Sequence, residues 1–361
     1  MADNIVVVGL VGGDDYTTIN AALAAVPADL TITAFDNWRI QVRDDQTHPA
    51  VLFPSVTQDT THRLILEAFA GDEVNGKGEG ALIQNNSSSI ATVRLVNQFD
   101  TLQSFKVKNL SAASGKALFA EASTTGFCFV NSCYVTGFRG YRAENGSGAK
   151  IQLFNIIFAD CADDGVSTGN IGAACEIIGD RLTAVRCGDR GFRDRAFGTG
   201  EVTYTNCLGL DCTVEDFQGN AAAIFFADFL ASSDATAAAT VTGGTDTSFI
   251  SRVITSDLED PNGVTPDYNL KSTSTLVGAG SGGSDIGATL GAASSGISVT
   301  GDTAAFDYNA LAGTVDLTGE ILVTGSTASF DYSAINGSID LTGQLLVTGQ
   351  TASFDYIALP G

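Results

Sequence analysis

The chain has 361 residues, of which 44% are hydrophobic and 16% are charged, so it is long enough to bury a large core or two domains. Its 41 acidic and 18 basic residues give a net charge of −23, which excludes nucleic acid and anionic membranes as bulk partners. The hydrophobic content also excludes a disordered chain.

The first residues predict a short strand and then a helix. Ile5 to Val8 is a short apolar run with no basic segment before it, so we expect no signal peptide and no membrane insertion. Ile19, Ala22, Leu23 and Val26 then recur at helical spacing behind Asp and Thr residues that can cap a helix. Residues 1–30 are therefore predicted to form a strand and a helix that covers the apolar end of the domain after them.

A short phrase repeats in the middle of the chain. The motif consists of a cysteine, three residues, a glycine and an apolar residue. It begins at Cys133, Cys161 and Cys187, which are 28 and 26 residues apart. Strand-like alternation inside units of this length predicts a β-solenoid. Successive coils stack at about 4.8 Å, so we expect these cysteines to form one ladder. A second ladder is expected from Gly137, Gly165 and Gly191.

Cysteine and histidine usage predicts no metal site. The seven cysteines fall between Cys128 and Cys212 without zinc spacing, so we expect buried thiols and assembly in a reducing compartment. The two histidines, His48 and His62, lie outside this region and are expected at the surface or at an edge.

Two segments carry a resemblance to a known superfamily. Tyr16-Thr-Thr-Ile-Asn-Ala-Ala-Leu precedes the coils, and Asp267-Tyr-Asn-Leu with Ser284-Asp-Ile-Gly-Ala resembles a closing coil. Together with the coils they resemble the right-handed parallel β-helix proteins typified by pectate lyases and phage tailspikes, over roughly residues 5–288. The resemblance implies an all-β fold with a parallel β-helix over residues 31–290. It says little of function, because the superfamily holds lyases, hydrolases and inert scaffolds.

A different repeat occupies residues 291–361. Val-Thr-Gly and Phe-Asp-Tyr each recur three times at a spacing of 24 residues, in short strand-like segments. Strands this short bury too little alone, so we expect them to find a core in sister copies, as three intertwined chains would allow. The residues expected to mediate this oligomerisation are Phe306, Tyr308, Phe330, Tyr332, Phe354 and Tyr356.

Three aspartates are the candidate catalytic residues. Asp160, Asp163 and Asp164 lie close together, and inverting glycosidases need two carboxylates about 6.5–9.5 Å apart. The cluster resembles the acidic signature of polygalacturonase-like hydrolases but lacks its histidine. Asp-Asp-Gly is also ordinary turn chemistry, so both interpretations stay open.

Arginines form the second candidate site. Seven of the twelve lie within 57 residues, and the candidate ligand-binding set is Arg139, Arg142, Arg190, Arg193 and Arg195. Such a patch would bind an acidic sugar, and pectate lyases use an arginine base with calcium held by carboxylates. The alternative is a ladder of ion pairs in which Asp164 and Arg190 stack on adjacent coils.

These patterns favour a non-enzymatic structural or adhesive virion protein, such as a phage capsid decoration, fibre or spike. It would assemble in the host cytoplasm as a homo-oligomer, expected to be a trimer, with other virion proteins and a host-surface glycan as partners. The alternative is a polysaccharide lyase or hydrolase acting as a tailspike depolymerase. We expect no cofactor, although Asp307, Asp331 and Asp355 would bind calcium if they met their symmetry mates.

Overall fold

A computed structural model describes residues 3–10, 13–33, 35–43, 46–121, 126–143, 150–168, 175–194, 201–219, 224–234 and 252–290, and strands between 298 and 359. The chain divides into two compact units, Met1–Leu290 and Gly291–Gly361.

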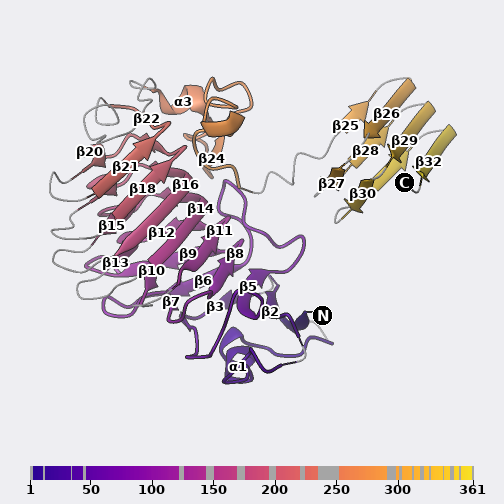
Figure 1. The fold of residues 1–361 in the computed structure, drawn as a ribbon. Coiled ribbons are helices and arrows are strands. Elements are labelled where there is room, and N and C mark those ends of the chain that lie inside the picture. Colours follow the sequence, from indigo (N-terminus) through magenta and orange to yellow (C-terminus); the bar gives the residue numbers. More distant parts are fainter. Residues whose placement is uncertain are drawn as a thin grey trace. The chain divides into compact units, whose positions relative to one another are not determined.

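The first unit is a parallel β-solenoid whose chain passes repeatedly through three columns of stacked strands (Figure 1). The first column holds β1 (Asn4–Val8), β2 (Asn37–Val42), β5 (Arg63–Ala68), β8 (Thr101–Gln103), β11 (Cys128–Asn131), β18 (Glu201–Thr205) and β21 (Ile224–Asp228). The second holds β3 (Thr47–His48), β6 (Leu82–Asn85), β9 (Lys106–Asn109), β12 (Tyr134–Thr136), β19 (Leu208–Leu210) and β22 (Ala231–Ser232).

Two long strands, β14 (Lys150–Ala159) and β16 (Glu176–Val185), run through the first and second columns, and each contains its corner residue, Asn155 in β14 and Arg181 in β16. The third column holds β4 (Val51–Leu52), β7 (Val93–Leu95), β10 (Lys116–Ala120), β13 (Arg139–Ala143), β15 (Val166–Thr168), β17 (Arg190–Arg193) and β20 (Glu215–Gln218). This arrangement confirms the predicted all-β parallel solenoid.

The columns meet at corners where one residue takes a left-handed backbone. At the first corner these residues include Ser132 (φ 51°), Asn155 (φ 53°) and Asn206 (φ 55°). At the second they are Asp160 (φ 50°), Arg186 (φ 51°) and Asp211 (φ 54°). Asn and Asp tolerate this conformation because their short side chains bond locally. The corners turn the chain within one or two residues and keep the columns in register.

The cysteine ladder differs from the expected one. Cys161, Cys187 and Cys212 follow the second corner and stack, with Gly188 N donating to Cys161 O (2.7 Å) and Thr213 N to Cys187 O (2.9 Å). Cys133 instead follows the first corner, where Ile157 N donates to its carbonyl (3.0 Å). The expected ladder is therefore wrong in its first member, because the phrase at Cys133 begins one column earlier.

The glycine ladder is corrected in the same way. Gly140, rather than Gly137, stacks with Gly165 and Gly191. A Cβ at Gly140 would collide with the Gly165 carbonyl oxygen, and one at Gly165 would lie 2.7 Å from that of Gly191. Glycine is required in these rungs because the backbone of the next coil occupies the space of a side chain.

The cysteines are free, and all but Cys212 are buried, as predicted. Burial raises the pKa of the Cys133 thiol to about 12, so this thiol behaves as a small apolar side chain. His48 is also buried, with 1% of its surface exposed, so the expected surface or edge position is wrong for this residue.

Helix α1 (Ile19–Ala24) covers the N-terminal end of the solenoid, as predicted (Figure 1). Thr18 caps it by accepting from Ala21 N (3.2 Å), and Ile19, Ala22 and Leu23 are buried. Within the described residues, no helix has the length and apolar character needed to cross a membrane.

Residues 252–290 form a covering segment over the second column, so the expected closing coil is not what the structure shows there. This covering segment includes α3 (Ile254–Asp257), the antiparallel pair β23 (Leu258–Asp260) and β24 (Asp267–Leu270), and a 3-10 turn, Ser281–Gly283. Leu258, Leu270 and Ile286 share a second apolar core with outward-facing Ile157 and Val185 of the second column. Asn155 and Thr289 exchange two hydrogen bonds of 2.9 Å, which fix the covering segment at the first corner.

The second unit stacks its repeats within one chain. Its strands are β25 (Ser298–Thr300), β26 (Thr303–Ala310), β27 (Gly313–Leu317), β28 (Ile321–Thr324), β29 (Thr327–Ile335), β30 (Gly337–Leu341), β31 (Leu345–Thr348) and β32 (Thr351–Leu359). They pair in parallel in the orders β25-β28-β31, β26-β29-β32 and β27-β30. Phe306, Phe330 and Phe354 occupy one register position, and Tyr308, Tyr332 and Tyr356 another. In-chain pairing thus replaces the expected lone ribbon, while the trimer stays a prediction.

Candidate functional site

The best-formed acidic cluster lies where the chain enters the third column. Carboxylate oxygens of Asp163, Asp164 and Asp189 all lie within 4.8 Å of one another. Asp189 N donates to Asp163 O (3.1 Å), so these two residues stack on adjacent coils. Two of the three aspartates predicted as catalytic are therefore brought together, and Asp189 joins them.

Arginines from neighbouring coils engage this cluster. Arg139 Nε lies 2.6 Å from Asp163, and Arg193 Nη1 lies 2.7 Å from Asp189 and 3.5 Å from Asp164. These contacts join β13 to the chain before β15 and to β17, across three successive coils. They form a ladder of ion pairs, which was the alternative to an acidic-sugar site for these arginines.

The specific pair expected between Asp164 and Arg190 is wrong. Gly165 N donates to Arg190 O (2.9 Å), so the two backbones stack as expected. The Asp164 side chain, however, is buried, whereas Arg190 contacts Asp189 (2.6 Å) and Glu215 of the next coil (3.0 Å). Register stacks the two backbones but does not fix which partners the side chains contact, and here Arg193 rather than Arg190 contacts Asp164.

Burial sets the protonation of Asp164. It raises the pKa of this carboxyl to about 6, repulsion from Asp163 adds to the shift, and Arg193 opposes it. A carboxyl that keeps its proton near pH 6 beside two other carboxylates has the chemistry of a general acid.

The spacing and pairing of the cluster restrict what it can do. Oxygens of the three carboxylates lie within 4.8 Å of one another, which is closer to the carboxyl separation of about 5–5.5 Å in a retaining glycosidase than to the 6.5–9.5 Å in an inverting one. Carboxylates also suit calcium, but Arg139 and Arg193 already contact Asp163 and Asp189. The donor set therefore fits ion pairing better than it fits a divalent cation.

The remaining predicted residues lie apart from this cluster or beyond what can be described. Asp160 occupies the second corner and accepts a hydrogen bond from the Tyr268 hydroxyl (3.0 Å), so it fixes the covering segment and is not the third carboxylate. Arg142 lies on β13 in register with Ser167, which in turn pairs with Arg193. Arg195 lies outside the described residues.

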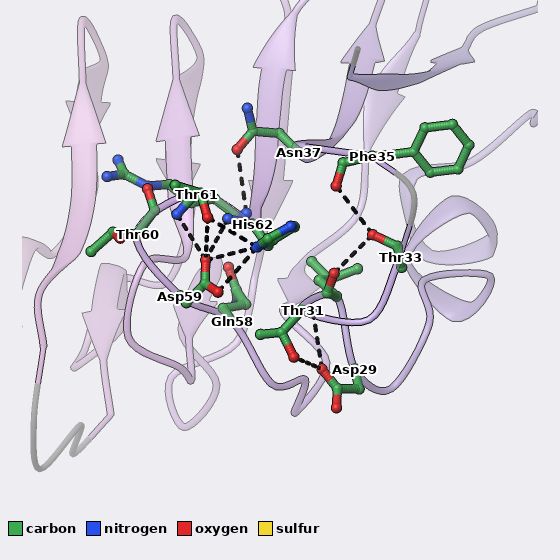
Figure 2. Close-up of polar contacts among 12 residues, drawn as sticks. Asp29, Thr31, Thr33, Phe35, Asn37, Gln58, Asp59, Thr60, Thr61 and His62 are labelled. Atoms are coloured by element: carbon green, nitrogen blue, oxygen red, sulfur yellow. Dashed lines mark hydrogen bonds and ion pairs between the residues drawn. The ribbon is translucent and has the colours of Figure 1, made fainter. Parts of the chain in front are cut away.

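A second polar cluster, which the sequence did not single out, precedes β5 (Figure 2). Asp59 Oδ1 accepts from the backbone N of Thr61 and His62 (2.8 Å each) and from His62 Nδ1 (2.9 Å). The Thr61 bond, followed by that from His62, holds the pKa of Asp59 well below its usual range. Asp29 and Thr31 repeat the turn one coil earlier, so the Asp-x-Thr spacing was the signal for it.

This cluster braces a turn and does not form a nucleophilic site. Thr61 Oγ1 lies 3.0 Å from His62 Nδ1, the nitrogen that already contacts Asp59. In a catalytic arrangement the hydroxyl would contact His62 Nε2, while the carboxylate would orient the ring through Nδ1.

Comparison with protein-family models finds no match, and comparison with curated proteins finds none either. Among solved structures, pectate lyase Pel9A matches with a TM-score of 0.43 and 12% identity over 80% of this chain and 96% of that one. Pectin methylesterase from Aspergillus niger matches with a TM-score of 0.41 and 15% identity over 69% of this chain and 90% of that one. The solenoid assignment rests on the strand register, and neither enzyme lends a residue role to this chain.

Proposed function

We propose that this chain is a non-enzymatic structural subunit of a virion, of the capsid-decoration, fibre or spike kind. The observation that supports this most is that arginines of adjacent coils contact the acidic cluster, Arg139 at Asp163 and Arg193 at Asp164. A site for a glycan would leave such groups available to the ligand, whereas here they connect successive coils. Ion pairs between successive coils suit a rigid structural solenoid.

The second unit supports a role in assembly. Its repeats stack in register, and residues 291–361 contain seven acidic residues and no Lys or Arg. A unit with this net charge repels anionic ligands, and salt screens the repulsion between copies of itself. We propose that the C-terminal repeats mediate self-association and attachment to the particle.

Deleting residues 297–361 tests this role. We expect a folded solenoid that retains a β-sheet circular dichroism spectrum, but a mass of one chain by sedimentation where the full chain associates. Retained association would show that the solenoid makes the contacts. A full-length chain that stays monomeric at micromolar concentration would overturn the proposal.

Glycan cleavage is the second candidate function. It is favoured by Asp164, which is buried beside Asp163 and has a pKa of about 6. These two carboxyls would act as acid and nucleophile of a retaining hydrolase. Acidic and neutral surface glycans are screened for new reducing ends with wild type, Asp164→Asn and the matched control Asp160→Asn. Cleavage lost only in Asp164→Asn supports an enzyme, and absence of cleavage by wild type counts against it.

A further inference from the structure

The second unit has strands with a single neighbour at both ends of its stack. Among its described strands, β26 pairs only with β29 at one end, and β32 pairs only with β29 at the other. Each leaves one row of backbone groups without a strand partner. An edge of this kind is a template for a further parallel strand.

The first unit treats its N-terminal edge differently. The outer edge of β1 is covered by its own chain, since Val7 N donates to Asp15 Oδ2 (2.9 Å) and Tyr16 N donates to Val7 O (3.1 Å). Helix α1 then covers the core beside it. Within the strands described between residues 298 and 359, there is no comparable helix or crossing segment.

The two edges of the second unit carry nearly the same sequence. Thr351–Tyr356 reads Thr-Ala-Ser-Phe-Asp-Tyr, and Thr303–Tyr308 differs only by Ala305 in place of serine. β32 already pairs in register with β29, whose segment Thr327–Tyr332 is identical to its own. The first coil of another copy therefore offers β32 the kind of strand that it already accepts.

We propose that the second unit associates head to tail, with β32 of one copy pairing in parallel register with β26 of the next. This inference rests on the proposed assembly role and names the partner as a second copy of this chain. Because the same two edges remain at the ends of each dimer, the contact repeats and gives an open series of sizes.

The register places like charges at the junction. Asp307, Asp331 and Asp355 occupy one register position, so Asp355 of one copy would lie beside Asp307 of the next. Neighbouring strands are about 4.8 Å apart, where paired carboxylates oppose association. Changing one of the two to lysine converts repulsion into attraction, and changing both restores repulsion.

A charge-swap cycle in the full chain tests this geometry by sedimentation velocity over a range of concentrations. Asp307→Lys and Asp355→Lys should each tighten association by about tenfold, and the double variant should return close to wild type. Asp331→Lys is the matched control, because it makes the same charge change in the same sequence context. Its two register neighbours, Asp307 and Asp355, belong to its own chain, so it does not lie at the junction between copies. It should leave association near wild type.

The outcomes separate this inference from the proposed function. An open series of multiples of one chain that follows the cycle supports the head-to-tail contact. A closed trimer, or end variants no tighter than Asp331→Lys, overturns the contact and leaves the assembly role standing. A chain that is monomeric at every concentration overturns both.

Discussion

Asp164 shows how a single side chain acquires its chemistry from the coils around it. Its backbone lies in an ordinary Asp-Asp-Gly turn, yet its side chain is buried beside Asp163 and Asp189. Arg193, from the following coil, offsets part of the repulsion. The protonation of this carboxyl therefore follows from its buried position among the coils.

The raised pKa of Asp164 predicts how pH affects stability. The native carboxyl binds its proton more tightly than the unfolded one, so its contribution is greatest at low pH and is lost as pH rises from about 4 to about 6. Asp164→Asn removes this pH dependence. The free energy of unfolding of the variant, relative to that of wild type, should therefore rise by about 2 kcal/mol between pH 4 and pH 7.

Urea unfolding of both proteins across this pH range measures the difference, and the deletion of residues 297–361 can serve as the common background. A difference that stays constant with pH would show that Asp164 titrates alike in the folded and unfolded chains.

At the scale of elements, the covering segment decides which strands are buried on both faces. In β14 the consecutive residues Ile157, Phe158 and Ala159 are all fully buried, one face against the solenoid core and the other under the covering segment. Asn155 fixes this segment through its two bonds to Thr289 while holding the left-handed corner. One residue therefore serves both the turn and the packing.

Substitution of Asn155 separates these two contributions. Asn155→Gly keeps the corner conformation but loses both bonds, which should cost about 1–3 kcal/mol. Asn155→Ala adds about 1–2 kcal/mol for a Cβ in the left-handed region. Hydrogen exchange at the Thr289 amide should accelerate in both variants, because that amide donates to Asn155.

The amide of Leu153, in the first-column part of β14, is the internal reference and should keep its protection. Unchanged exchange at Thr289 in Asn155→Gly would contradict the anchoring role.

At the scale of the whole molecule, the two units differ in how they handle charge. The solenoid places several arginines beside acids of neighbouring coils, namely Arg139 with Asp163, Arg190 with Glu215 and Arg193 with Asp164. The second unit instead stacks acidic positions in register with no Lys or Arg. Repulsion between such rows is screened by salt, since the Debye length falls from about 30 Å at 0.01 M to about 3 Å at 1 M.

Salt should therefore raise the unfolding temperature of the second unit and have little effect on, or slightly lower, that of the solenoid. Scanning calorimetry of the full chain in sodium chloride measures both transitions, and the deletion of residues 297–361 identifies which belongs to the solenoid. A second-unit transition that falls with added salt would contradict the effect of the aspartate rows.

Much of the fold and part of the site were predictable from local patterns. Strand alternation, the capping helix and the 24-residue repeat all rest on spacing within one segment, and the structure contains each of them. The grouping of Asp163 with Asp164 was predictable because they are adjacent. Asp160 was misassigned because it is itself the corner residue, and its carboxylate accepts from Tyr268 of the covering segment. The Ile156–Ala159 run was an unused signal of two-sided burial.

Local patterns were sufficient to specify that this chain forms parallel coils, since period, alternation and glycine content act within a few residues of one another. Which cysteines and glycines stack on one another depends on tertiary contacts, because the same motif can occur at either of two similar corners. These contacts also decided that Arg193 rather than Arg190 contacts Asp164, and that residues 252–290 lie along the second column. These outcomes depend on side-chain direction and on contacts between distant segments, neither of which spacing along the chain specifies.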